Sequence, residues 1–213
     1  NGPTSGCFNQ DPSVVRQSAS DNLWRYAPSM YDRIEQAAMQ DVASAWCVRQ
    51  SGVETLRERY PAIAERIRFV PTWVDVENFH PVDPATRHRL RHALAQEHGI
   101  PADAPWIVSV GRLDTQKDPL LMCDAFARLV AQGQDVHWLV IGDGVLRPEM
   151  LRRVQEQGVA SRVHFLGLQP PVRIADWLRS ADVYALTSAY EGMPMAVLEA
   201  LGSGLPVVAT DVG

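Results

Sequence analysis

Short apolar runs alternate with amphipathic stretches through the second half of the chain. The runs hold four to six residues and are apolar on both faces, which is typical of strands in a parallel sheet covered by helices on both sides. Between them lie stretches of roughly 10 to 15 residues whose apolar positions recur at helical spacing. The predicted strands are 106–110, 136–141, 162–166, 183–186 and 206–209. This alternation predicts an α/β fold with a Rossmann-like, doubly wound parallel sheet, in which ligands bind beyond the carboxyl ends of the strands.

Prolines, glycines and capping residues mark the ends of the predicted helices. A helix over 86–98 is expected to stop at Gly99, and Asp118 followed by Pro119 predicts the start of another helix. Prolines and polar residues interrupt regular structure over 71–85, which we therefore interpret as a linker between domains.

Before this linker the pattern is weaker. Residues 1–28 are polar and lack a sustained period, so they are predicted to be mostly irregular. Ser51 and Glu54 form a capping-box pattern that predicts a helix start. The elements expected here are a helix from Ser29, a strand over 42–48, a helix over 51–60 and a strand over 68–70. The chain begins at Asn1 without a methionine and stops just after an apolar run, so we expect both ends to be incomplete.

The composition is that of a folded α/β protein. Of the 213 residues, 46% are hydrophobic and 21% are charged, which excludes disorder, collagen and coiled coil. The net charge of -5 argues against nucleic acid or an anionic membrane surface as the main partner. No stretch reaches the roughly 18 unbroken apolar residues of a spanning helix. Cys7, Cys47 and Cys123 lie far apart and are odd in number, so they indicate reduced cytosolic thiols rather than a disulfide framework or a zinc site.

The loop after the strand predicted over 106–110 carries two cations. Arg112 and Lys117 stand within six positions, follow Gly111 and lead directly into a predicted helix. A bidentate guanidinium, a compact ammonium and the backbone N–H groups of a helix start are suited to binding two adjacent phosphates. Lys117 is the only lysine of the chain, beside 19 arginines. Taken alone, it is equally well interpreted as a solvated surface lysine.

A second informative stretch joins two glutamates to a helix start at Pro194. Glu191 precedes this helix and Glu199 projects from its second turn, so both carboxylates could face the cleft at the strand ends. Carboxylates accept hydrogen bonds from the vicinal hydroxyls of a ribose or a hexose. From spacing alone, a solvated loop acid and an ordinary helix-surface glutamate are favoured over these roles.

Other motifs do not complete a known site. Gly142 and Gly144 follow a predicted strand but lack the third glycine of a dinucleotide fingerprint, and the chain has no GxxxxGK[ST] loop. The sequence therefore supports neither a nicotinamide cofactor nor P-loop binding of ATP. His88 and His92 stand four apart on a predicted helix, but no carboxylate or cysteine completes a metal-ligand set, so a solvated face is favoured.

Several segments follow one another in a characteristic order. They are Phe69–Pro81, Val108–Leu113 with Lys117, Ile141–Gly144, Phe165–Gly167, Glu191–Pro194 with Glu199–Leu201, and Pro206–Thr210. In order and spacing they resemble glycosyltransferase family four, the retaining GT-B group, over roughly residues 41–213. The first segment departs from the family, which usually has Asn-Gly where this chain has Thr72 and Trp73.

The resemblance implies a nucleotide-sugar-binding domain of the Rossmann type. Arg112 and Lys117 would hold the donor diphosphate, Glu199 would bind the ribose and Leu166 would lie beside the base. The donor-binding residues that it implies are Gly111, Arg112, Lys117, Leu166, Glu191, Gly192, Met195 and Glu199. The implied catalytic residues are Glu191, Arg112 and Lys117.

The implied chemistry is sugar transfer with retention of anomeric configuration. Glu191 and the backbone N–H groups around Gly192 and Met195 would face the donor sugar and its β-phosphate. The two cations would stabilise the departing diphosphate, so we expect no metal and no cofactor. The expected enzyme is a hexosyltransferase of polysaccharide biosynthesis that takes sugar from a nucleotide-diphosphate sugar to a glycan or lipid-linked acceptor, in the cytoplasm or at the inner face of the membrane.

The resemblance also divides the chain. Residues 1–70 would be the C-terminal remnant of a first, acceptor-side Rossmann-like domain, 71–85 the linker, and 86–213 a nucleotide-sugar-binding domain truncated at its C-terminus. The first domain's glycine-rich loop and active-site histidine have no counterpart here, so the fragment alone is expected to be inactive, and any peripheral membrane contact would come through the missing first domain. The alternative is a non-catalytic nucleotide-sugar-binding half that needs a separate acceptor-binding subunit. A third alternative is a GT-B phosphorylase or epimerase. A pyridoxal phosphate aldimine requires a lysine, and the only one lies in the diphosphate loop, which argues against the phosphorylase.

Overall fold

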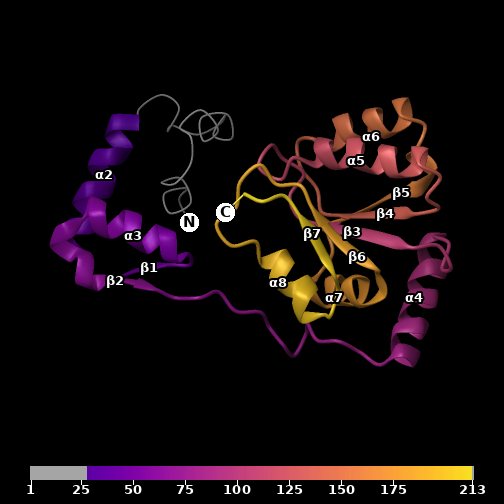
Figure 1. Ribbon diagram of the computed structural model, residues 1–213, viewed down its shortest axis with the longest axis horizontal. Helices are drawn as coiled ribbons and strands as arrows, with labels where there is room; N and C mark the ends of the chain where they lie inside the picture. The colour runs from indigo at the N-terminus through magenta and orange to yellow at the C-terminus, as the bar shows by residue number, and fades with distance from the viewer. Residues whose placement is uncertain (1–27, 213) are drawn as a thin grey trace. The chain divides into compact units, whose positions relative to one another are not determined.

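The computed structural model describes residues 28–212, and their contacts divide them into two compact units (Figure 1). The smaller unit holds the described residues up to Thr72 together with Tyr190–Met193, and the larger unit holds Trp73–Ala189 and Pro194–Val212. The division into domains at 1–70, 71–85 and 86–213 stays a prediction. Within the described residues, no helix is both long enough and apolar enough to cross a membrane.

The smaller unit is a two-stranded parallel sheet with helices. Its elements are α2 (Pro28–Asp41), β1 (Ala45–Cys47), α3 (Gln50–Arg59), the 3-10 helix η2 (Pro61–Arg66) and β2 (Ile67–Phe69). The strand predicted over 42–48 covers only Ala45–Cys47, because the chain bends at Ala43 and again at Val48. The predicted capping box is wrong, since α3 starts after an extended Arg49 that makes no side-chain capping bond. On α2 the apolar residue Ile34 is 57% exposed.

The larger unit is built on five parallel strands in the order β5-β4-β3-β6-β7. Their bounds are β3 (Trp106–Val110), β4 (His137–Ile141), β5 (Val163–Gly167), β6 (Val183–Leu186) and β7 (Val207–Ala209). Every bound lies within one residue of the prediction, which confirms the α/β class and the parallel sheet. The chain runs outward from β3 through β4 to β5, then returns to the other side of β3 as β6 and β7, which is a doubly wound order.

Helices cover both faces of this sheet (Figure 1). The bounds are α4 (Pro84–His98), α5 (Pro119–Ala131), α6 (Arg147–Glu156), α7 (Pro171–Ser180) and α8 (Met195–Gly202), with a 3-10 turn η3 (Ala160–Arg162) before β5. Strand β4 is buried at every position and alternates between two cores. Trp138 and Val140 pack with α5 and α6, whereas Leu139 and Ile141 pack with α4, α7 and α8. The continuous apolar run of β4 therefore follows from burial on both sides.

Helix α4 begins two residues earlier than predicted. Pro84 occupies its first turn, and the side chain of Asp83 caps it by accepting a hydrogen bond of 2.9 Å from the N–H of Thr86. Proline is favoured at the first helical position, because an N–H there would have no acceptor within the helix and its absence costs no hydrogen bond. Pro84 therefore opens the helix and does not extend the linker.

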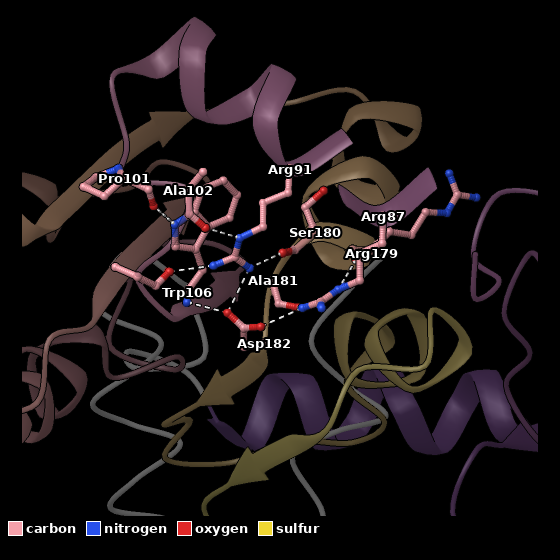
Figure 2. A network of polar contacts seen from close by, with 10 residues as sticks. Arg87, Arg91, Pro101, Ala102, Trp106, Arg179, Ser180, Ala181 and Asp182 are labelled. Carbon is pink, nitrogen blue, oxygen red and sulfur yellow. Dashed lines mark hydrogen bonds and ion pairs between the residues drawn. The ribbon is translucent and has the colours of Figure 1, made fainter. Parts of the chain in front are cut away.

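A polar network ties α4 to the amino ends of β3 and β6 (Figure 2). The carboxylate of Asp182 accepts hydrogen bonds from Arg87 Nη2 at 2.6 Å, Arg91 Nη1 at 2.9 Å and the N–H of Trp106 at 2.8 Å. The guanidinium of Arg91 also lies 4.3 Å from the centre of the Trp106 ring. These contacts fix α4 at the end of the sheet opposite the carboxyl ends of the strands.

Candidate functional site

The strand order of the larger unit reverses between β3 and β6. In open α/β sheets, this reversal leaves a crevice at the carboxyl ends of the two strands, where ligands bind. A cavity of about 30 Å³ lies there, with room for about two water molecules. Its lining includes Gly111, Arg112, Lys117, Ile141, Leu186 and Thr187. A ligand of the size of a nucleotide would therefore extend beyond this cavity.

The floor of this crevice depends on two glycines after β4. The N–H of Gly111 donates to the carbonyl oxygen of Ile141 at 3.0 Å, and Gly142 has a φ of 131°. A Cβ on Gly142 would stand 1.9 Å from the carbonyl oxygen of Gly111, and one on Gly144 would stand 2.4 Å from that of Leu113. Gly142 and Gly144, which do not complete a dinucleotide fingerprint, therefore allow the loop after β4 to pack its backbone against the backbone of the loop after β3.

Lys117 reaches across the start of its own loop. The methylene chain of its side chain passes 3.6 to 3.8 Å from the position that a Cβ on Gly111 would occupy. Helix α5 begins two residues after Lys117, and Asp118 caps it by accepting a hydrogen bond of 3.2 Å from the N–H of Leu121. The ammonium and the positive end of the helix dipole thus belong to one short segment, and both favour an anion.

Arg112 is held by polar side chains of the same loop. Its Nη2 lies 2.8 Å from Oε1 of Gln116 and 3.3 Å from Oδ2 of Asp114, while 69% of its side chain is exposed. The other carboxylate oxygen of Asp114 accepts a hydrogen bond of 3.1 Å from the N–H of Lys117. Asp114 and Gln116 therefore shape the loop that carries both cations. The sequence could have indicated this role in one way only, through the position of both residues between Arg112 and Lys117.

Thr187, the residue directly after β6, forms hydrogen bonds with the same loop. The hydroxyl of Thr187 donates to the carbonyl oxygen of Asp118 at 2.9 Å and lies 3.3 Å from that of Lys117. The N–H of Ala189 donates to the carbonyl oxygen of Gln116 at 2.8 Å. Nothing in the local sequence of Thr187 predicts this role, because the two loops meet only through the order of the strands.

The remaining predicted donor-binding residues do not line this cavity. Glu199 is half-buried on α8, and burial raises the pKa of its carboxyl. Met195 is the first residue of α8 and is 40% exposed, whereas nothing packs within 4 Å of where a Cβ on Gly192 would lie. Leu166 stands where the pairing of β4 and β5 slips by a residue, and its half-buried side chain packs against the core. Their roles toward a ligand stay predictions.

Glu191 is buried, with 6% of its surface exposed. By their contacts, residues 190–193 group with the smaller unit, where Arg49 Nη1 donates to the carbonyl oxygen of Glu191 at 3.2 Å. The structure thus brings Gly111, Arg112 and Lys117 to one cavity, and the catalytic role of Glu191 stays a prediction.

Histidines form two pairs in the larger unit. The rings of His88 and His92 lie 4.1 Å apart on α4, and Nδ1 of His137 lies 2.9 Å from Nε2 of His164 on the neighbouring strand. Among the described residues, no three histidine, cysteine or acidic side chains are grouped so that they could hold a metal ion.

Comparison with known sequences assigns the chain to a family. The family described as Glycosyl transferases group 1 matches residues 104–213, which include the β3, β4 and β6 loops of the cavity. The chain belongs to this family. A D-inositol 3-phosphate glycosyltransferase from Xylanimonas cellulosilytica is 36% identical over 167 residues, which make up 75% of this chain and 38% of that protein. A 2-deoxystreptamine glucosyltransferase from Streptomyces kanamyceticus is 34% identical and covers 100% of this chain and 56% of its own length.

Solved structures of glycosyltransferases share the fold. The Anabaena protein HepE, in complex with UDP and glucose, is 22% identical with a TM-score of 0.71, over 85% of this chain and 48% of that protein. A sucrose-phosphate synthase from Thermosynechococcus elongatus is 26% identical with a TM-score of 0.68, over 85% of this chain and 44% of its own. The chain therefore shares the fold of glycosyltransferases of the GT-B type, and it spans about half the length of the proteins that it matches or less.

Proposed function

We propose that this chain supplies the donor-binding part of a hexosyltransferase, which moves a sugar from a nucleotide-diphosphate sugar to a glycan or lipid-linked acceptor with retention. The observation that carries the proposal is the convergence of Arg112 and Lys117 on the cavity between β3 and β6, at the start of α5. In the larger unit these residues offer an anion a guanidinium, an ammonium and a helix dipole together.

The chemistry required of this site is stabilisation of a leaving group. As the bond between the sugar and the β-phosphate breaks, negative charge grows on the phosphate oxygen and the sugar becomes oxocarbenium-like. Arg112 can donate two parallel hydrogen bonds to phosphate oxygens, and Lys117 provides a compact charge beside the positive end of α5. Because these groups offset the developing charge, the proposed reaction needs no metal and no cofactor.

The other residues have assigned roles in this proposal. Glu199 accepts hydrogen bonds from the ribose hydroxyls, and Leu166 lies beside the base. Glu191 and the N–H groups around Gly192 and Met195 face the donor sugar and its β-phosphate. The fold shared with HepE, whose structure contains UDP and glucose, supports a donor of this class.

The acceptor and the surroundings belong to the proposal as well. The relatives are named for D-inositol 3-phosphate and 2-deoxystreptamine, so acceptor tests should include these small molecules beside glycans and lipid-linked acceptors. We place the reaction in the cytoplasm, which agrees with the free, buried thiols of Cys47 and Cys123, and any contact with the inner face of the membrane comes through the first domain. Nothing observed favours the alternative of a non-catalytic half that works with a separate subunit.

The test is calorimetric titration of the chain with UDP, GDP and ADP. We expect one diphosphate to bind saturably, and Arg112→Ala to weaken it by about 1 to 3 kcal/mol while the matching nucleoside is hardly affected. Glu199→Ala should weaken the nucleoside and the diphosphate alike.

Arg152→Ala is the matched control. Arg152 lies on the exposed surface of α6, where it pairs with Glu149 and Glu156, so its removal should leave binding unchanged. If a folded chain binds none of the three diphosphates, or if Arg112→Ala and Arg152→Ala behave alike, the assignment of this cavity to the donor is wrong.

A further inference from the structure

Thr187 connects two loops of the cavity through its hydroxyl. It follows the last residue of β6 and lines the cavity with Gly111 and Lys117. Its Oγ1 lies 2.9 Å from the carbonyl oxygen of Asp118 and 3.3 Å from that of Lys117. The single hydroxyl proton is therefore directed at the backbone of the turn, not into the cavity.

The turn that Thr187 holds is strained. Asp118 has a φ of 39°, and it is the one non-glycine residue with a positive φ in the part of the chain that the structure describes. For a residue with a Cβ, the left-handed region is unfavourable, so it persists where neighbouring contacts enforce it. Within the loop, Asp114 accepts hydrogen bonds from the N–H groups of Lys117 and Asp118. From outside it, the hydroxyl of Thr187 bonds the carbonyl oxygen of Asp118, and the N–H of Ala189 bonds that of Gln116.

We propose that Thr187 is a positioning residue for the donor diphosphate and that it acts through Lys117. By holding the carbonyl groups of Lys117 and Asp118, it fixes the direction in which the lysine side chain leaves the backbone. That direction sets where the ammonium stands beside Gly111, over which the side chain passes. The inference rests on the proposed donor site.

The only lysine of the chain makes this inference measurable without a ligand. Reductive methylation with ¹³C-formaldehyde gives one side-chain signal, that of Lys117, besides the signal of the terminal amino group. Thr187→Val keeps the shape of the side chain and removes the hydroxyl, whereas Thr187→Ser keeps the hydroxyl. We expect the valine variant to move the Lys117 signal toward that of a solvated lysine, and the serine variant to retain the original signal.

Binding is measured by calorimetry on unmodified protein with UDP and with inorganic pyrophosphate. Because pyrophosphate has no base, its affinity reports on the diphosphate contacts alone. Loss of the hydroxyl should weaken pyrophosphate binding roughly threefold to tenfold, and Thr187→Ser should restore it to within about twofold. In a Lys117→Met background, Thr187→Val should cause no further loss, because the residue acts through the lysine.

Thr210→Val is the matched control. The hydroxyl of Thr210 donates to the carbonyl oxygen of Ser188 at 2.6 Å, so this variant removes the same kind of bond from the same loop without touching the turn at Asp118. Thermal unfolding should show comparable destabilisation of both valine variants, while the Lys117 signal should move only in Thr187→Val.

The outcomes separate this inference from the proposed function. If Lys117→Met abolishes pyrophosphate binding but Thr187→Val changes neither affinity nor signal, the donor site stands and the role of Thr187 is refuted. If Thr187→Val weakens binding equally without Lys117, the threonine contacts the ligand itself and the inference is also wrong. If the native chain binds neither probe, the proposed function fails, and an unmoved Lys117 signal in Thr187→Val would still overturn the positioning role.

Discussion

Asp182 is the charge on which the attachment of α4 depends (Figure 2). Replacing it by asparagine keeps the size of the side chain but removes the negative charge that faces Arg87 and Arg91. The side chain of Arg91 is only 12% exposed, whereas that of Arg87 is 42% exposed. The larger loss therefore falls on Arg91, which would keep only uncharged acceptors, namely the carbonyl oxygens that it already contacts and the single amide oxygen of the asparagine.

The expected cost of Asp182→Asn follows from these exposures. Removing one partner of a fully buried ion pair costs about 3 to 5 kcal/mol, and an exposed pair contributes about 1 kcal/mol or less. With Arg91 still bonded to carbonyl groups, we expect a loss of about 2 to 3 kcal/mol in the free energy of unfolding of the larger unit. With a urea dependence of about 2 kcal/mol per molar, the unfolding midpoint should fall by roughly 1 M.

Urea unfolding followed by tryptophan fluorescence measures this loss, because Trp106, Trp138 and Trp177 are buried in the larger unit. Asp135→Asn is the matched control, since Asp135 is 77% exposed and pairs only at the surface with Arg162. Burial raises the pKa of Asp182, but the hydrogen bonds from Trp106, Arg87 and Arg91 together outweigh burial, so the pKa lies below its ordinary value. The difference from native protein should therefore shrink as pH falls below about 4. Equal midpoints for the two variants would refute the reasoning.

Two further predictions concern buried titratable groups. Burial, followed by the charges of its histidine neighbours, lowers the pKa of His164 to about 4, and burial also lowers that of His137. Because an unfolded histidine titrates near 6.5, the folded chain should lose up to about 3 kcal/mol between pH 6.5 and 4, and His164→Gln should flatten that dependence of the urea midpoint. Burial raises the pKa of Glu199, so its ionised form is a cost to folding that appears as pH rises above about 4.3. Glu199→Gln should therefore stabilise the chain against urea at pH 7 while weakening nucleoside binding in calorimetry. A variant that loses both stability and nucleoside affinity would contradict the role of Glu199 as a ribose ligand.

The sheet of the larger unit was predictable because burial leaves a strong pattern. Every position of β4 is buried, so the apolar run and the strand coincide nearly residue for residue. The smaller unit was harder, because strands of three residues such as β1 carry too few positions to show a period. The start of α4 was missed for a different reason, since Pro84 is compatible with both a break and a first helical turn.

Charge and topology contributed differently to the candidate site. Arg112 and Lys117 could be predicted from sequence, because cations before a helix start have a local chemical meaning. Thr187 and Gly142 could not, since each is explained by a loop that lies far away in the chain, around Asp118 and Gly111 respectively. Which loops meet is decided by the reversal of strand order at β3 and β6, and no local period encodes that reversal. Substitutions that impair the site should therefore include residues that never touch the ligand, and these are found only after the order of the strands is known.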